Sequence, residues 1–153
     1  MIYFHIAFCK PSEVEILESC EGTLVKGNYI MSPNYPQYYP INGIDCRWTI
    51  STAPKKNITL TFIDFNTYYE DSLKLSDGNN VDGTLLSTYS GSSASLFVSS
   101  GHKLHLRFTS DRCYYDTCSG RGSQNGFKIE VSGKCTYYHI ITSIQNVAFK
   151  FHL

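Results

Sequence analysis

Ser32-Pro33-Asn34-Tyr35-Pro36 is the stretch that decides the fold of this chain. A second Tyr-Pro pair follows at Tyr39-Pro40, Cys20 lies upstream, and Cys46-Arg47-Trp48-Thr49-Ile50 lies downstream. Proline and asparagine in such a cluster favour a turn. In the downstream stretch the cysteine, the tryptophan and the isoleucine fall on one face of a strand, because successive side chains of a strand point to opposite faces. The sequence therefore predicts a turn that leads into a half-buried strand.

Alternation of apolar and polar residues continues through the middle of the chain. The apolar positions are Cys46, Trp48, Ile50, Ile58, Leu60, Phe62, Leu73, Leu75, Leu104, Leu106, Phe108, Phe127, Ile129 and Val131. The polar positions opposite them include Asn57, Thr59, Thr61, Lys103, His105, Arg107, Lys128, Glu130 and Ser132. Turn residues such as Asp77-Gly78 separate these runs. Strands of this kind predict an all-β sandwich of two antiparallel sheets.

One stretch, residues 12–19, has helical spacing instead. Ser12 can cap the backbone near Glu15, and Val14 and Leu17 share a face. We therefore predict a short helix ahead of the sandwich.

The order and spacing of further motifs resemble a CUB domain, an extracellular β-sandwich module used for binding. The motifs that carry the resemblance, besides the opening stretch, are Leu73-Lys74-Leu75-Ser76-Asp77-Gly78, Tyr89-Ser90-Gly91, Val98-Ser99-Ser100-Gly101, Leu104-His105-Leu106-Arg107-Phe108-Thr109-Ser110-Asp111 and Gly126-Phe127. The resemblance covers residues 20–131 and implies a jelly-roll topology. It predicts a CUB domain at residues 20–133, with extensions at residues 1–19 and 134–153.

Six cysteines in a short chain favour disulfides and a secreted or extracellular location. The resemblance implies a disulfide between Cys20 and Cys46, and Cys113 and Cys118 are close enough to close a small loop of their own. Cys9 and Cys135 remain; they pair with each other or with parts of a larger protein. Many CUB domains carry a second bridge, but here Tyr68 and Ser90 stand at its two positions, so both halves are missing together.

The resemblance also implies a calcium site, since many CUB domains hold an acidic cluster at one end of the sandwich. Asp71 and Asp111 fall on the two aspartate positions, and carboxylate oxygens are the hard ligands that calcium prefers. Tyr68 stands at the glutamate position, where Glu70 is the candidate substitute. The alternative is that the two aspartates are solvated loop carboxylates, or that one of them pairs with Arg112.

Clustered tyrosines are candidates for contact with a partner, because tyrosine offers a large contact area at low entropy cost. Tyr68 and Tyr69 share one loop, and Tyr114 and Tyr115 lie between Cys113 and Cys118. The insert at residues 112–125 either gives this chain its specificity or is a tolerated surface insertion. Tyr35 and Tyr39 belong to the turn motif and are interpreted as structural.

Other features bound the function. Thirteen basic and thirteen acidic residues balance, so no global field favours nucleic acid or an anionic membrane. No catalytic motif is present, which predicts a protein that is not an enzyme.

Asn57-Ile58-Thr59 is a glycosylation sequon with Asn57 facing outward. Residues 1–8 are apolar but lack a basic start and a cleavage site, so they form a weak signal segment or a truncated start. No segment is apolar and long enough to span a membrane.

Together these observations predict an extracellular module that binds a protein or glycan. By the resemblance, a loop-end acidic cluster, with or without calcium, contacts basic side chains of that partner. The alternative is an accessory CUB domain cut from a secreted metalloprotease or an endocytic receptor.

Overall fold

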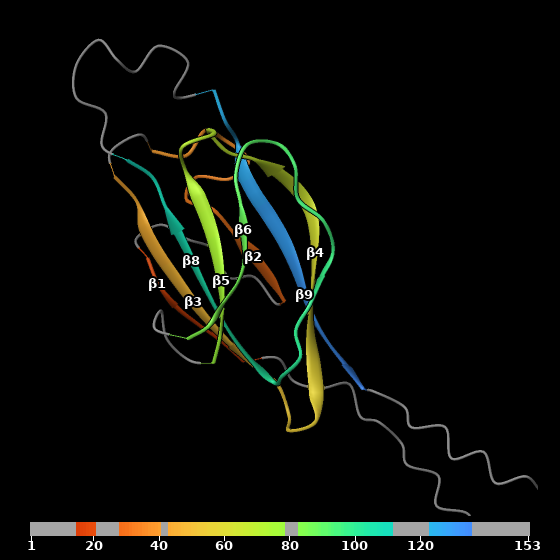
Figure 1. Ribbon diagram of the computed structural model, residues 1–153. Coiled ribbons are helices and arrows are strands. Elements are labelled where there is room, and N and C mark those ends of the chain that lie inside the picture. The colour runs from red at the N-terminus through yellow and green to blue at the C-terminus, as the bar shows by residue number, and fades with distance from the viewer. Residues whose placement is uncertain (1–14, 21–27, 41–42, 79–82, 112–122, 136–153) are drawn as a thin grey trace, which may run out of the picture.

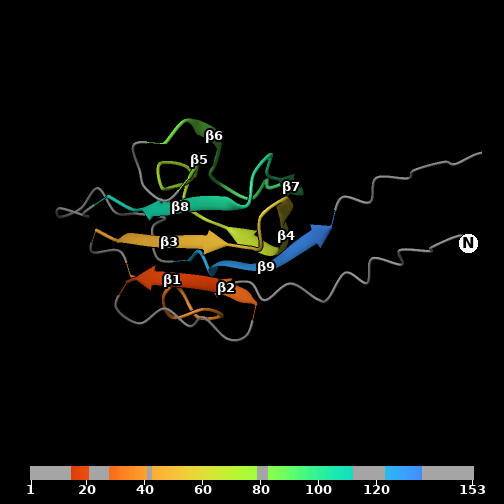
Figure 2. The ribbon, with the colours of Figure 1, turned by 90° about the horizontal axis from the view of Figure 1, so that it is seen from below.

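The structure, a computed structural model, describes residues 15–20, 28–40, 43–78, 83–111 and 123–135. These residues form two antiparallel sheets packed face to face, as the sequence predicts (Figures 1 and 2). The strands are β1 (Glu15–Ser19), β2 (Tyr29–Met31), β3 (Asp45–Ser51), β4 (Lys56–Asn66), β5 (Ser72–Asp77), β6 (Leu85–Tyr89), β7 (Phe97–Val98), β8 (Lys103–Thr109) and β9 (Gly126–Cys135). Within the described ranges, no helix has the length and apolar character needed to cross a membrane.

The described strands are ordered β1-β3-β8-β5-β6 in a five-stranded sheet and β2-β9-β4-β7 in a four-stranded sheet. The chain crosses repeatedly between the sheets, so most neighbours within a sheet are distant in sequence. Figure 2 shows β1, β3 and β8 running side by side on one layer. The residues just before β5 and the first residues after β8 lie at one end of the sandwich, in contact with each other and with the segment that follows the turn after β2.

The predicted helix at residues 12–19 is wrong where the structure describes it. Residues Glu15–Ser19 form β1, which pairs antiparallel with β3 and places Glu18 opposite Trp48. An eight-residue helix is marginal by itself, whereas the edge of β3 offers a full row of backbone hydrogen-bonding partners. The five-stranded sheet thus begins before residue 20, the predicted start of the domain.

Inward-facing residues of both sheets form the core that the alternation predicts. Trp48, Leu106, Phe108 and Phe127 are fully buried. The ring of Phe127 lies edge-to-face with Phe108 at 5.1 Å and with Trp48 at 5.8 Å between centroids. Burying such a side chain stabilises a fold by about 1.5–3 kcal/mol. This aromatic cluster joins β3 and β8 of one sheet to β9 of the other.

Simple alternation fails in the middle of β4. A register shift between Phe62 and Asp64 leaves Ile63 54% exposed, although isoleucine is apolar. The extra residue of the bulge reverses the alternation that follows it. Phe65 therefore returns to the core, with its ring 5.5 Å from that of Phe62.

The turn at residues 32–36 is held against β9 by backbone and side-chain hydrogen bonds. The Ser32 N–H donates to the Phe127 carbonyl at 3.1 Å, and the Phe127 N–H donates to Ser32 Oγ at 3.0 Å. Gly126, which precedes Phe127, has a φ of +82°, and a Cβ there would stand only 2.7 Å from Ser32 Cβ. Glycine at this position thus permits the turn to approach the strand.

A disulfide joins Cys20, at the end of β1, to Cys46 in β3, as the resemblance implies. We expect Cys20→Ala/Cys46→Ala to lower the free energy of unfolding by about 3 kcal/mol, because the cross-link restricts the unfolded chain. Urea unfolding of the double variant and of the oxidised protein measures the difference. Equal midpoints would show that the sheet holds β1 without the covalent link.

A second prediction concerns Gly126. We expect Gly126→Ala to be less stable than Gly78→Ala by at least about 2 kcal/mol, because only the first variant meets Ser32. Gly78 is the matched control, since its φ is +85° and a Cβ there has no atom within 4 Å. Thermal and urea unfolding of the two variants isolate the close approach from backbone strain. Equal losses would contradict the role assigned to Gly126.

Candidate functional site

A buried hydroxyl and a buried carboxylate connect the loops at one end of the sandwich. Tyr39, in the segment that follows the turn, is 5% exposed, and Asp71, just before β5, is 2% exposed. The Tyr39 O–H donates to Asp71 Oδ2 at 2.6 Å, and the same hydroxyl accepts the Tyr68 N–H at 2.8 Å. The Asp71 N–H donates to the Tyr68 carbonyl at 3.0 Å. These bonds fix the loop between β4 and β5 on the turn segment.

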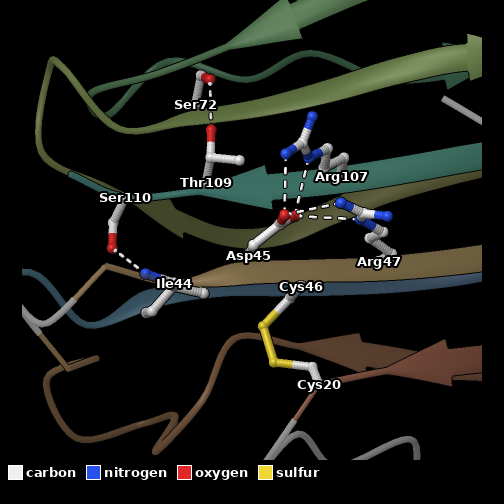
Figure 3. A network of polar contacts seen from close by, with 9 residues as sticks. All are labelled: Cys20, Ile44, Asp45, Cys46, Arg47, Ser72, Arg107, Thr109 and Ser110. Atoms are coloured by element: carbon white, nitrogen blue, oxygen red, sulfur yellow. Dashed lines mark hydrogen bonds and ion pairs between the residues drawn. A yellow bond between two sulfur atoms is a disulfide. The ribbon is translucent and has the colours of Figure 1, made fainter. Parts of the chain in front are cut away.

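The second oxygen of Asp71 reaches the loop that follows β8. Asp71 Oδ1 accepts the N–H of Asp111 at 3.3 Å. Ser110, the preceding residue, is fixed to the segment before β3, because its Oγ accepts the Ile44 N–H at 2.9 Å and its N–H donates to the Ile44 carbonyl at 3.0 Å (Figure 3). Asp71 therefore links the loop after β8 to the loop before β5, and Asp111 lies exposed beside it.

The structure brings together two of the three predicted calcium ligands. Asp71 and Asp111 are in contact through the bond just described, whereas Glu70 is exposed at the preceding loop position. Among the described residues, no three His, Cys, Asp or Glu side chains lie close enough together to hold a metal ion. The chemistry of the two aspartates suits calcium, and the calcium site remains a prediction.

The predicted tyrosine contacts lie at the same end where the structure describes them. The rings of Tyr68 and Tyr69 are 4.4 Å apart between centroids, and Tyr69 is 67% exposed. The hydrogen bond with Tyr68, and then the charge of Glu70, raise the pKa of the Tyr69 hydroxyl to about 12. The hydrogen bond and the nearby carboxylate therefore favour the protonated form of the Tyr69 hydroxyl.

Several predicted residues fall outside the described part of the chain. They are Cys9, Arg112, Cys113, Tyr114, Tyr115, Cys118 and the segment at residues 1–8. Asn57 is described: it is half-buried in β4 and lies opposite Lys134 of β9. Thr59 of the same sequon is 1% exposed, although the alternation predicts it on the outer face, and it lies opposite Ser132 of β9 and Val98 of β7. Occupancy of the sequon remains a prediction.

Tyr39 is the residue whose role the sequence analysis missed. The sequence places Tyr39 in a turn motif with a structural role, and in the structure its hydroxyl also bridges Asp71 and Tyr68. The sequence offers one hint of this role. A buried tyrosine, unlike a phenylalanine, carries a hydroxyl that usually has a hydrogen-bond partner. That partner lies more than thirty positions away, and its identity depends on the topology.

A second polar cluster lies on the outer face of the five-stranded sheet (Figure 3). Asp45 accepts two hydrogen bonds from Arg107, both at 2.8 Å, and two from Arg47, at 2.8 and 3.2 Å. The Arg107 and then the Arg47 hydrogen bonds hold the pKa of the Asp45 carboxyl well below its usual range. These exposed pairs stabilise the fold above about pH 4 and lose that contribution as the pH falls toward the lowered pKa.

His105 lies next to this cluster and departs from the predicted alternation. It occupies an outward position of β8 but is only 5% exposed. Its Nδ1 is 3.3 Å from the Thr49 hydroxyl, whereas its Nε2 is buried with no hydrogen-bond partner among the described residues. Burial first, and then the charges of Arg47 and Arg107, lower the pKa of the imidazole.

The family model for the CUB domain matches residues 20–131. The chain belongs to the CUB domain family. A CUB domain is a non-catalytic, extracellular binding module. The match therefore agrees with the predicted β-sandwich fold and with the predicted class, an extracellular binding module. The loop end that joins Tyr39, Asp71 and Asp111 is thus one rim of a CUB sandwich.

Curated relatives of this CUB domain are much longer proteins. Cubilin of Sus scrofa is 33% identical over 126 residues, which cover 76% of this chain and 3% of cubilin. Neuropilin-2 of Homo sapiens is 35% identical over 103 residues, covering 60% of this chain and 11% of the relative. Zinc metalloproteinase nas-39 of Caenorhabditis elegans is 32% identical over 113 residues, which cover 70% of this chain and 12% of the relative. The chain therefore spans about an eighth or less of these relatives.

Solved structures support the fold of the CUB domain. The CUB1-EGF-CUB2 domain of human MASP-1/3 matches with a TM-score of 0.57 and 22% identity, over 71% of this chain and 41% of that chain. The extracellular region of zebrafish Gpr126/Adgrg6 matches with a TM-score of 0.55 and 22% identity, over 71% of this chain and 14% of that chain.

A third prediction tests the bridge made by Tyr39. We expect Tyr39→Phe to lower the free energy of unfolding by about 2–3 kcal/mol, because it leaves a buried carboxylate oxygen and the Tyr68 N–H without this partner. Tyr38→Phe is the control, since Tyr38 is 57% exposed and should change stability by less than about 0.5 kcal/mol. Urea unfolding measures both, and equal losses would contradict the bridging role.

Proposed function

We propose that this CUB domain binds an extracellular protein or glycan through the rim formed by Tyr68, Tyr69, Asp71 and Asp111. The observation that carries the proposal is the double use of the buried Asp71 carboxylate, which accepts hydrogen bonds from Tyr39 and from the Asp111 backbone. The exposed Asp111 carboxylate and the exposed Tyr69 ring belong to residues at or next to positions that these hydrogen bonds hold in place. Binding to ordered loops costs less conformational entropy than binding to loose ones.

The proposed contact is with basic side chains of the partner. The Asp111 carboxylate can accept hydrogen bonds from a lysine or arginine, and such charge-assisted bonds are stronger than neutral ones. The Tyr69 ring supplies apolar area beside it, over which the stem of a long basic side chain can lie. The same rim is proposed to hold calcium through Asp71 and Asp111, with Glu70 as the further candidate. A bound calcium ion would relieve repulsion between the carboxylates and hold them in one arrangement.

A second candidate is an accessory domain within a larger secreted metalloprotease or endocytic receptor. It is supported by the length of the curated relatives, which include a zinc metalloproteinase of which this chain matches 12%. In that setting the same rim would contact a neighbouring protein or a substrate. Secretion of the chain itself is part of both proposals.

A fourth prediction tests the rim with calcium. We expect millimolar calcium chloride to raise the thermal midpoint of the wild-type protein, because a ligand bound only by the folded state stabilises it. Asp111→Asn should remove that rise, whereas Asp77→Asn, which changes an exposed carboxylate at the far end of β5, should keep it. An unchanged wild-type midpoint would reject calcium binding.

The partner contact is tested separately with a synthetic decalysine peptide, whose binding is measured by calorimetry with calcium or with chelator. We expect Asp111→Asn to weaken binding about tenfold and Asp77→Asn to leave it nearly unchanged. Equal losses in the two variants would reduce the interaction to general charge attraction. Peptide binding that survives chelation would support the rim as a partner site without calcium.

A further inference from the structure

A row of cations crosses the outer face of the five-stranded sheet. The strand register places Arg47 of β3 directly opposite Arg107 of β8, and Arg107 directly opposite Lys74 of β5. Neighbouring strands are about 4.8 Å apart, so the three positions span about 10 Å in a nearly straight line. Like charges placed directly opposite across strands destabilise a sheet. The arrangement thus costs stability unless an anion lies against it.

One carboxylate compensates part of this charge. Asp45 bonds to both arginines, whereas Lys74 is exposed and forms no ion pair with any described residue. Arg47, Arg107, Lys74, Lys103 and His105 occupy outward positions of β3, β5 and β8, and Asp45 is the one acidic residue at those positions. Three fixed positive charges therefore meet one negative charge along the row, and the excess lies toward Lys74.

A pocket of about 240 Å³ lies at the Lys74 side of the row. Its lining includes Lys74, Ser76, Leu85, His105 and Arg107. The lining thus offers an ammonium group, a guanidinium group, a hydroxyl and an imidazole on neighbouring strands. Leu85 closes one side with an apolar surface. Such a set of donors suits the oxygens of an anion.

The imidazole of His105 gives a second, independent reason to expect a ligand. When the Thr49 hydroxyl donates to Nδ1, the neutral ring carries its proton on Nε2, which is then a donor. That atom is buried and lacks a partner among the described residues, although buried polar groups in folded proteins are almost always satisfied. An anion oxygen or a water held in the pocket would supply the missing acceptor.

We propose that this face is a binding site for sulfated glycans, with one sulfate group seated in the pocket between Lys74, His105 and Arg107 and the chain continuing along the row toward Arg47. A linear polyanion fits a straight row of cations better than a single small anion does. The family is extracellular, where sulfated glycans are an abundant source of tetrahedral oxyanions. The site is distinct from the acidic rim and needs no calcium.

The test measures binding of a heparin-derived decasaccharide by calorimetry in chelator at low salt. We expect Lys74→Gln to weaken binding about tenfold. Lys128→Gln is the matched control, since it removes the same charge from β9 in the other sheet, and it should change affinity by less than about twofold. Asp45→Asn should tighten binding severalfold, because it removes the anion that competes for both arginines. Asp111→Asn, which alters the rim, should not weaken binding.

A second measurement follows the protein by nuclear magnetic resonance during addition of sodium sulfate. We expect the ring signals of His105 to move and those of His102, outside the pocket, to stay nearly fixed. Equal losses for Lys74→Gln and Lys128→Gln, or no decasaccharide binding at low salt, would overturn the proposal. It would also be overturned if a polyglutamate peptide of equal charge bound as tightly, since the site would then recognise acidic peptides rather than sulfated glycans.

Discussion

The two hydrogen bonds between Ser32 and Phe127 are the constraint on which the rest of this structure depends. They hold the turn after β2 on the first residues of β9, where Gly126 leaves room for the serine side chain. The backbone of Tyr39 is then anchored a few residues later, since its N–H donates to the Gln124 carbonyl at 3.3 Å. Its ring packs edge-to-face on Phe108 at 5.4 Å, and its hydroxyl arrives at Asp71. The turn thus positions Tyr39 so that its ring packs in the core and its hydroxyl holds the loop at the rim.

This dependence explains why the fold could be predicted in more detail than the site. The inward positions of β3, β8 and β9 follow from alternation alone, because burial of one face imposes a period of two on the sequence. Leu104, Leu106 and Phe108, for example, are all fully buried as predicted. A polar contact depends on which strands become neighbours, and that information is not local. Neither the bond from Tyr39 to Asp71 nor the row from Arg47 to Lys74 is visible in the spacing of residues.

The errors of local interpretation have physical causes. Residues 15–19 carry a weak helical pattern, but pairing with β3 satisfies their backbone and overrides it. In β4 the bulge at Ile63 turns an apolar residue outward and Phe65 inward, which no count of alternate positions would predict. His105 stands at an outward position and is nevertheless buried, since long arginine side chains lie next to it on both strands of the β3–β8 pair. The burial of a side chain on the outer face of a sheet therefore depends on the size of the side chains next to it, and not only on its position in the strand.

Overall charge is a poor guide to what such a sandwich can bind. The chain carries equal numbers of acidic and basic residues, which argues against a field that acts over the whole molecule. Register nevertheless concentrates Arg47, Arg107 and Lys74 in one row, while Asp71 and Asp111 meet at the adjoining rim. Exposed charges more than about 10 Å apart are largely screened at physiological salt, so each group acts mainly on what touches it. Asp45 lies two residues before Arg47 on β3 and binds both arginines, whereas Lys74, beside the pocket, forms no ion pair with any described residue.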